Sequence, residues 1–158
     1  VTVRARLFLA DLWDKKLGWD QPLTPQDANA WKTIEKELSA ASNFQFPRLV
    51  DLDHTQPVCL HVFPDASKSV MGAVAYLSQE KKCFLVGSKS KLAPRGKKNL
   101  TIPQLELSAM LIGSQFGANT LAIVKKQFPD VRICLWTDPE SRTALAFLFS
   151  QVKKIRPK

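Results

Sequence analysis

The sequence predicts an α/β protein in which a small helical subdomain precedes a mixed four-stranded sheet. Apolar residues recur at helical spacing over the first 40 residues, whereas short apolar runs of strand length begin near residue 58. Three such runs follow one another closely, and a fourth comes after a long helical pattern. This order predicts three antiparallel strands and a fourth strand parallel to the first. We therefore assign residues 1–55 to a helical subdomain with its linker and residues 56–158 to the α/β domain.

Two helices are predicted before the sheet. Apolar positions at mostly helical spacing indicate the first over residues 3–17, and Gly18 is a suitable C-terminal cap. Thr24 can cap a second helix, whose first residue is Pro25 and which ends near Ala40. A linker with few periodic residues then separates this pair from the first strand.

The α/β domain is predicted to contain four strands and two helices. Its first strand is a nearly continuous apolar run, which is typical of a central strand covered on both faces. Residues 78–82 join the second strand to the third, and Pro103 suits an early position of the long helix. In chain order the six elements are expected at 58–63, 70–77, 83–88, 101–124, 131–136 and 140–152.

The composition is that of a basic globular domain. Of the 158 residues, 45% are hydrophobic and 23% are charged, which excludes a chain that is mainly disordered. Lys and Arg number 23 against 14 Asp and Glu, a formal net charge of +9. No apolar run approaches the ~20 residues of a membrane span, and the N-terminus lacks the pattern of a signal peptide. We therefore expect an intracellular protein that is not secreted and has no membrane partner.

The cysteines and histidines do not predict a metal site. Cys59, Cys83 and Cys134 are odd in number, lack C-x-x-C spacing, and each lies in an apolar run. Such cysteines are usually small core residues of a reducing compartment. Neither His54 nor His61 has a second ligand at the spacing that zinc sites use, so no zinc site is expected.

The positive charge is concentrated in the second region. Residues 1–55 carry a net charge of −1 and residues 56–158 a net charge of +10. A dense basic cluster is interrupted by proline and glycine and is therefore expected on a loop; its members are Lys89, Lys91, Arg95, Lys97 and Lys98. Such a cluster favours binding to a phosphate backbone, because it releases condensed counterions. A solvated basic loop or a localisation signal is the alternative.

Three acidic residues occupy positions where a metal site is plausible. Asp65 is expected just past the first strand, Glu106 in the first turn of the long helix, and Asp138 just past the fourth strand. If the first and fourth strands are parallel neighbours, their carboxyl ends lie at one edge of the sheet, where open sheets bind ligands. Converging carboxylates are stabilised by hard divalent cations, Mg²⁺ or Mn²⁺.

Each acid also has a simpler interpretation. Asp65 could be a turn residue, and Glu106 could interact favourably with the helix dipole. Asp138, which precedes Pro139, could cap the final helix. Their joint occurrence at two strand ends and one helix start favours the metal site.

The motifs around these residues, taken in order, closely resemble a known family. They are HVFPDAS (61–67), GAVAYL (72–77), SKSKLAP (88–94), LTIPQLEL (100–107) and LWTD (135–138). This ordered set resembles the RNase H-like domain of Pao/BEL-type retrotransposon polyproteins. The N-terminal motifs ARLFLADLW (5–13) and LGWDQPL (17–23) resemble the helical connection between reverse transcriptase and RNase H in the same elements.

The resemblance implies a ribonuclease H-like fold, with helices against the mixed sheet, and two-metal hydrolysis of RNA in RNA–DNA hybrids. Asp65, Glu106 and Asp138 would be its catalytic carboxylates and would hold two Mg²⁺ or Mn²⁺ ions. The basic cluster would hold the hybrid. The reverse transcriptase portion of the polyprotein would be a partner, in the cytoplasm, the nucleus or a virus-like particle.

Two departures from the family pattern bear on activity. The fourth carboxylate of the family lies in a later segment, which this chain, ending at Lys158, does not include, so we expect a C-terminally incomplete domain. Pro139 stands where relatives usually have Ser, and Glu140 is more typical of a dipole-favoured surface residue than of a substitute ligand. The alternatives to an enzyme are a non-catalytic nucleic-acid-binding remnant and a structural connection that docks on the polymerase.

Overall fold

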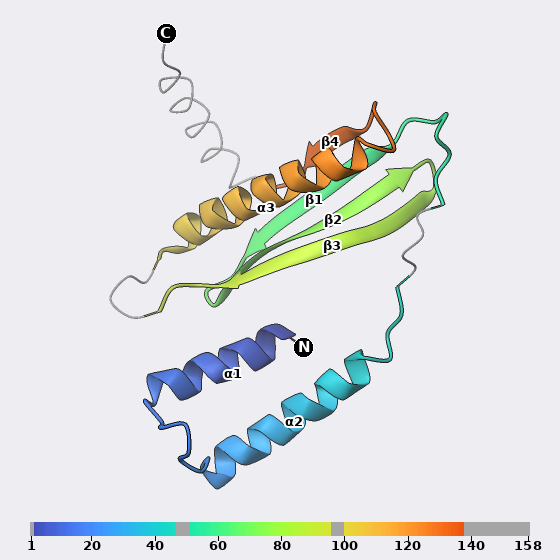
Figure 1. Ribbon diagram of the computed structural model, residues 1–158. Helices are drawn as coiled ribbons and strands as arrows, with labels where there is room; N and C mark the ends of the chain where they lie inside the picture. The colour runs from blue at the N-terminus through green and yellow to red at the C-terminus, as the bar shows by residue number, and fades with distance from the viewer. Residues whose placement is uncertain (1, 47–50, 96–99, 138–158) are drawn as a thin grey trace. The chain divides into compact units, whose positions relative to one another are not determined.

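The chain folds into two compact units. In this computed structural model residues 2–46, 51–95 and 100–137 are described (Figure 1). The first unit is Val1–Arg48 and the second is Leu49–Lys158. Leu52 belongs to the core of the second unit, and the Gln79 side chain hydrogen-bonds the backbone of Asp53. The segment that leads into the first strand is therefore anchored on the sheet.

The first unit is a pair of helices, α1 (Thr2–Asp14) and α2 (Pro25–Ala41). The prediction that α1 continues to Gly18 is wrong, since Lys16 takes a left-handed conformation (φ 54°). The backbone N–H of Lys16 donates to Trp13 at 3.0 Å and closes the last turn before Gly18 is reached. The chain therefore turns two residues earlier than the glycine suggests.

The N-terminus of α2 is fixed by the predicted cap. The Thr24 hydroxyl accepts the Asp27 backbone N–H at 3.2 Å, and Pro25 occupies the first helical position. The Lys15 ammonium lies 2.7 Å from the Asp27 carboxylate. The hydrogen bond from Lys15, followed by that from Thr24, lowers the pKa of Asp27. These contacts tie the turn after α1 to the start of α2.

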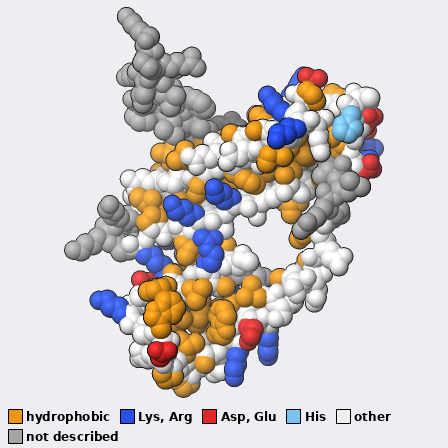
Figure 2. Space-filling model, in the orientation of Figure 1, with side chains coloured by type: hydrophobic (Ala, Val, Ile, Leu, Met, Phe, Trp, Pro, Cys, Tyr) orange, Lys and Arg blue, Asp and Glu red, His pale blue; other side chains and the backbone are white. Residues whose placement is uncertain are grey.

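Aromatic and apolar side chains join the two helices but leave much apolar surface exposed. Phe8 stacks on Trp31 with ring centroids 5.8 Å apart, and Ile34 is the buried residue of α2. Trp19 is 91% exposed and packs edge-on against Trp13. Figure 2 shows hydrophobic side chains gathered on the surface of this unit.

The second unit contains a mixed sheet with the strand order β3-β2-β1-β4. The strands are β1 (Cys59–Ala66), β2 (Val70–Gln79), β3 (Lys82–Leu92) and β4 (Arg132–Leu135). β1 pairs antiparallel with β2 and parallel with β4, and β2 pairs antiparallel with β3. The predicted α/β fold, with three antiparallel strands and a fourth parallel to the first, is therefore confirmed.

The hairpin between β2 and β3 is tighter than predicted. Gln79 pairs with Lys82, so the turn contains only Glu80 and Lys81, in place of the expected five-residue connection. Glu80 adopts a positive φ of 51°, which two-residue hairpins require. The tight turn sets the register as far as the Tyr76–Leu85 pair. A bulge then shifts the register by one residue, and pairing continues from Ala75–Gly87 to the far end of both strands.

The helix α3 (Ile102–Val124) lies along one face of the sheet and builds the core there (Figure 1). Its close approach depends on glycine. A Cβ placed on Gly113 would lie 2.8 Å from Pro64 Cβ, and one on Gly117 would lie 3.1 Å from Val62 Cγ2. Leu60 and Val62 are fully buried beneath the helix.

The position of α3 accounts for part of its apolarity, while Leu111 and Ile123 on the same helix are exposed. By length and composition alone, α3 is apolar enough to cross a membrane, with a mean hydropathy of 1.4, so the expectation that no stretch approaches a membrane span is corrected. Its buried residues, among them Leu105 and Ala109, pack against the sheet. A core helix of an α/β domain meets the same test of length and composition.

Candidate functional site

Asp65 lies inside β1, not just past it as predicted. It is the penultimate residue of the strand and pairs with Gly72 of β2. The ladder continues because Ser67 closes the hairpin: its backbone N–H donates to the Val70 carbonyl at 2.7 Å, and its hydroxyl accepts the Val70 N–H. The interpretation of Asp65 as a turn residue is therefore excluded.

The strand also continues through Pro64, which sequence analysis takes as its end. The Val58 carbonyl accepts the N–H of Arg132 in β4, and the Val62 carbonyl accepts that of Trp136, just after β4. The backbone N–H and C=O groups of even-numbered β1 residues therefore point toward β4. The last residue of β1 paired with β4 is Val62. Pro64 comes after it, where its missing N–H costs no ladder hydrogen bond.

The Asp65 side chain is exposed beside polar groups. Its Oδ1 accepts the Ala66 backbone N–H at 2.8 Å, which orients the carboxylate. Together with Ser67, Ser88 and Ser90, it lines an open depression of about 360 Å³. Oxygen donors therefore predominate among the polar side chains around this carboxylate.

Glu106 is the fifth residue of α3, and the first turn of this helix holds no acidic residue. The predicted first-turn position, and with it the simple helix-dipole interpretation, is wrong. The helix begins within one residue of the expected start, with Thr101 as the N-cap and its backbone N–H donating to Gln104 Oε1 at 2.9 Å. A turn holds ~3.6 residues, so the fifth residue falls in the second turn. Glu106 is half-buried and lies one turn before buried Met110.

The packing of α3 places Glu106 at the Asp65 end of β1. Gly117 lies over Val62 and Gly113 over Pro64, so four helical residues match two strand residues. This agrees with a rise of ~1.5 Å per helical residue and ~3.3 Å per strand residue. Glu106 is seven residues before Gly113, or ~10.5 Å along the helix, which corresponds to about three strand residues beyond Pro64. It therefore lies level with the turn that follows Asp65 and Ala66.

The two carboxylates approach this end from different sides of the sheet. Val62 and Pro64 face α3, so alternation along the strand places Asp65 on the opposite face. Within the described residues β4 stops at Leu135, opposite Val62, which leaves the β1 edge between the carboxylates uncovered. Asp138, the third predicted ligand, lies outside the described residues, as do Pro139 and Glu140.

The basic cluster does not form a single loop. Lys89 and Lys91 are exposed residues of β3, paired with Ala73 and Met71, so the predicted loop placement is wrong for both. The long β2–β3 ladder is the reason. Residues directly opposite share a face, and Ala73 packs under α3, so both lysines lie on the α3 side.

The remaining members of the cluster follow β3. Arg95 is exposed beyond the end of the strand, and Lys97 and Lys98 lie outside the described residues. Figure 2 shows Lys and Arg side chains near the end of the sheet at which β3 finishes. The described basic residues of the cluster therefore lie along the outer strand β3 and just after it.

One comparison decides the family. Residues 1–139 match the family model of the Pao retrotransposon-like RNaseH-like domain, which includes both the helical unit and the described part of the sheet. The chain belongs to this family. The resemblance and the ribonuclease H-like fold inferred from the motifs are thereby confirmed for this Pao domain. No match was found among curated proteins.

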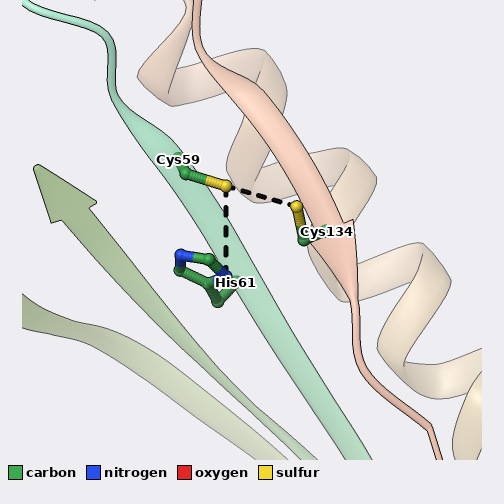
Figure 3. A group of neighbouring side chains, drawn as sticks. All are labelled: Cys59, His61 and Cys134. Atoms are coloured by element: carbon green, nitrogen blue, oxygen red, sulfur yellow. Dashed lines mark hydrogen bonds between the residues drawn. The ribbon is translucent and has the colours of Figure 1, made fainter.

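A second group of potential ligands in the Pao domain was missed by sequence reasoning. Among the described residues, Cys59, His61 and Cys134 are the group of three whose ligand atoms lie within 4.8 Å of one another (Figure 3). The parallel pairing of β1 with β4 sets His61 opposite Cys134, and Cys59 precedes His61 by two residues on the same face. Sequence spacing cannot reveal a cluster that forms across strands 75 residues apart.

This cluster adjoins an aromatic group on the face away from α3. The Trp136 indole N–H donates to His61 Nδ1 at 2.9 Å. Trp136 stacks on Phe63 with centroids 6.1 Å apart and planes within 9°, and Tyr76 meets Phe63 edge-on. The Pao domain thus has a sulfur, imidazole and aromatic surface on the strand that carries Asp65.

The cluster predicts a pH dependence of stability. Burial, and then the hydrogen bond with Cys134, raises the pKa of the Cys59 thiol from 9.0 to about 11. This stabilisation is complete below about pH 9 and is lost as the pH rises through about 11, since the unfolded chain ionises first. In urea unfolding with a chelator present, wild type should therefore lose more free energy of unfolding over this range than Cys59→Ser. The exposed-site variant Cys83→Ser should behave as wild type, and an equal loss in Cys59→Ser would contradict the assignment.

Proposed function

We propose that the Pao domain hydrolyses the RNA strand of RNA–DNA hybrids, with Asp65, Glu106 and Asp138 as the ligands of two Mg²⁺ or Mn²⁺ ions. The observation that supports this most strongly is the arrival of Glu106 at the end of β1 that carries Asp65. Because the chain belongs to an RNase H-like family, we interpret this arrangement as a site for metal-dependent hydrolysis of RNA.

The donor chemistry of these residues fits such ions. Carboxylate oxygens are the preferred ligands of hard divalent cations, whereas thiolate and imidazole ligands favour softer ones. When bound, two such ions supply an activated water and stabilise the negative charge of the phosphate and the leaving 3′ oxygen. Asp65 and Glu106 are thus suited to bind Mg²⁺ or Mn²⁺, whereas the group of Cys59, His61 and Cys134 is not.

The contribution of the chain is to hold these carboxylates in place. Asp65 lies on a paired strand with one oxygen fixed by the Ala66 N–H. Glu106 projects from the second turn of a helix that is anchored on the sheet through Gly113. Because water is the nucleophile, no serine, cysteine or histidine has to attack the phosphate.

We propose further that the basic residues along and after β3 hold the backbone of the hybrid. Lys89 and Lys91 are the described members on the strand, and they alternate with Ser88 and Ser90. Phosphate contacts of this kind recognise shape and charge, not base sequence. The reverse transcriptase part of a retrotransposon polyprotein is the proposed covalent partner, and an intracellular compartment the proposed location.

Cleavage assays with the full 158-residue chain test this function. A labelled RNA–DNA hybrid is incubated with Mg²⁺ or Mn²⁺, beside the matched DNA duplex and the free RNA strand. We expect cleavage of RNA in the hybrid only, and its loss on addition of a chelator. Cleavage that is indifferent to the DNA strand, or that survives chelation, would contradict the proposal.

A failure to cleave would distinguish the enzymatic function from a binding function. The +10 charge of residues 56–158 favours a nucleic-acid-binding module as the second candidate. Absence of cleavage together with hybrid binding that weakens steeply with salt would establish binding in place of hydrolysis for this chain. The absence of both would reject the two functions together.

A further inference from the structure

We propose that Cys59, His61 and Cys134 form a binding site for a thiophilic metal ion of the Zn²⁺ class, separate from the carboxylate site. The three residues belong to two paired strands of the sheet, and all three are half-buried. Rigid strands hold ligand atoms more accurately than loops do. The site needs no residue of the proposed hydrolytic centre.

The distances suit tetrahedral coordination. The sulfur atoms of Cys59 and Cys134 are 3.4 Å apart, and Cys59 Sγ lies 3.9 Å from His61 Nδ1 (Figure 3). With zinc–sulfur bonds of ~2.3 Å and zinc–nitrogen bonds of ~2.0 Å, tetrahedral ligand atoms lie roughly 3.5–3.8 Å apart. These two distances are within a few tenths of an ångström of that range, and all three ligand atoms lie within 4.8 Å of one another, so small side-chain movements bring three ligands around one ion and leave a fourth position open.

The hydrogen bonds of His61 leave its lone pair on Nδ1, the ring nitrogen that lies 3.9 Å from Cys59 Sγ. An indole N–H only donates, so the hydrogen bond from Trp136 requires an unprotonated Nδ1. The proton therefore resides on Nε2, which lies 2.8 Å from the Ser78 hydroxyl and donates to it. Metal-binding histidines are commonly oriented in this way by a hydrogen bond from the other ring nitrogen.

Trp136 occupies the direction from which the ion would bind. Its N–H contacts the Nδ1 lone pair, so the metal ion replaces this hydrogen bond when it binds. Trp136 is 52% exposed, so its side chain has room to turn toward solvent. Metal binding is thus expected to change the environment of the aromatic group formed with Phe63.

Titration with Co²⁺ tests the site, since tetrahedral Co²⁺ bound to thiolates absorbs in the visible and near-ultraviolet regions. The full chain is kept reduced with a phosphine that does not compete as a thiol. We expect one Co²⁺ per chain with thiolate charge-transfer absorption, and its displacement by one equivalent of Zn²⁺. The absence of this absorption would overturn the proposal.

Matched variants assign the ligands. Cys134→Ser should weaken Co²⁺ binding at least about tenfold, whereas Cys83→Ser, at an exposed position of β3, should leave it unchanged. Asp65→Asn should also leave the spectrum unchanged, which separates this site from the carboxylates. Equal spectra for wild type and Cys134→Ser would reject the assignment.

A second measurement uses the unmodified protein and does not depend on how a variant folds. Zn²⁺ should slow alkylation of Cys59 and Cys134 at least about tenfold and leave Cys83 unaffected, as read by mass spectrometry of the labelled peptides. Equal rates with and without Zn²⁺ at the two strand cysteines would reject the site.

Discussion

Replacing Asp65 by Asn should lower the rate of hybrid cleavage by at least about 10³-fold, equivalent to ~4 kcal/mol in the activation barrier. The amide keeps the size of the side chain, and its Oδ1 can still accept the Ala66 N–H. It removes the negative charge that a divalent cation needs. Because Asp65 is exposed, the free energy of unfolding should change little. Initial cleavage rates at saturating hybrid measure the effect.

Two controls make this result specific. Asp130→Asn changes an exposed acid just before β4, at the opposite end of the β1–β4 pair, and should leave the cleavage rate unchanged. Hybrid affinity measured without divalent metal should be equal in wild type and Asp65→Asn. A variant that cleaves at more than about one tenth of the wild-type rate would exclude Asp65 from the catalytic site.

The second large effect concerns stability. Gly113→Ala should destabilise the sheet unit by about 1–3 kcal/mol, even though alanine is the better helix former by ~1 kcal/mol. The added methyl would lie 2.8 Å from Pro64 Cβ, and the proline ring cannot rotate away. The helix must therefore shift from β1, and Glu106 must shift with it. Urea unfolding monitored by circular dichroism gives the change in free energy.

Neighbouring positions on α3 serve as controls. Gly117→Ala should cost less, because its methyl would lie 3.1 Å from Val62 Cγ2 and from Ile133 Cδ1, the far end of a half-exposed side chain, in place of 2.8 Å from a proline ring. Ser114→Ala changes an exposed position of the same helix and should be neutral or slightly stabilising. If Gly113→Ala is as stable as Ser114→Ala, the close approach of α3 to β1 does not limit stability.

Asp65 and Glu106 are both misplaced in the sequence-based prediction, for different reasons. The first strand is expected to end before Pro64. The backbone nitrogen of Pro64 points to the β4 side of β1, but past Val62, the last residue paired with β4, so the strand continues. Glu106 is expected in the first turn of α3, but it is the fifth residue of a helix whose start is predicted to within one residue. Strand pairing decides where β1 ends, and a single sequence does not display it.

The basic cluster and the cysteines illustrate the same limit at longer range. Lys89 and Lys91 are flanked by serine and followed by proline, yet the register of the β2–β3 hairpin includes them in a strand. Cys59 and Cys134 have no motif spacing, and only the parallel pairing of β1 with β4 brings their sulfur atoms together. Residue spacing in the sequence therefore predicts neither the full length of β3 nor the approach of the two cysteines.

By itself, the sequence determined the order of the elements up to β4, the mixed sheet and the family, because apolar periodicity and ordered motifs can be recognised along the chain. The helix predicted over residues 140–152 lies outside the described residues. Only the tertiary structure decided which side chains share a face. It set Glu106 at the Asp65 end of β1 through the fit of Gly113 on Pro64, and His61 opposite Cys134 through strand pairing. The physical reason is that register and close packing are fixed by contacts between distant residues.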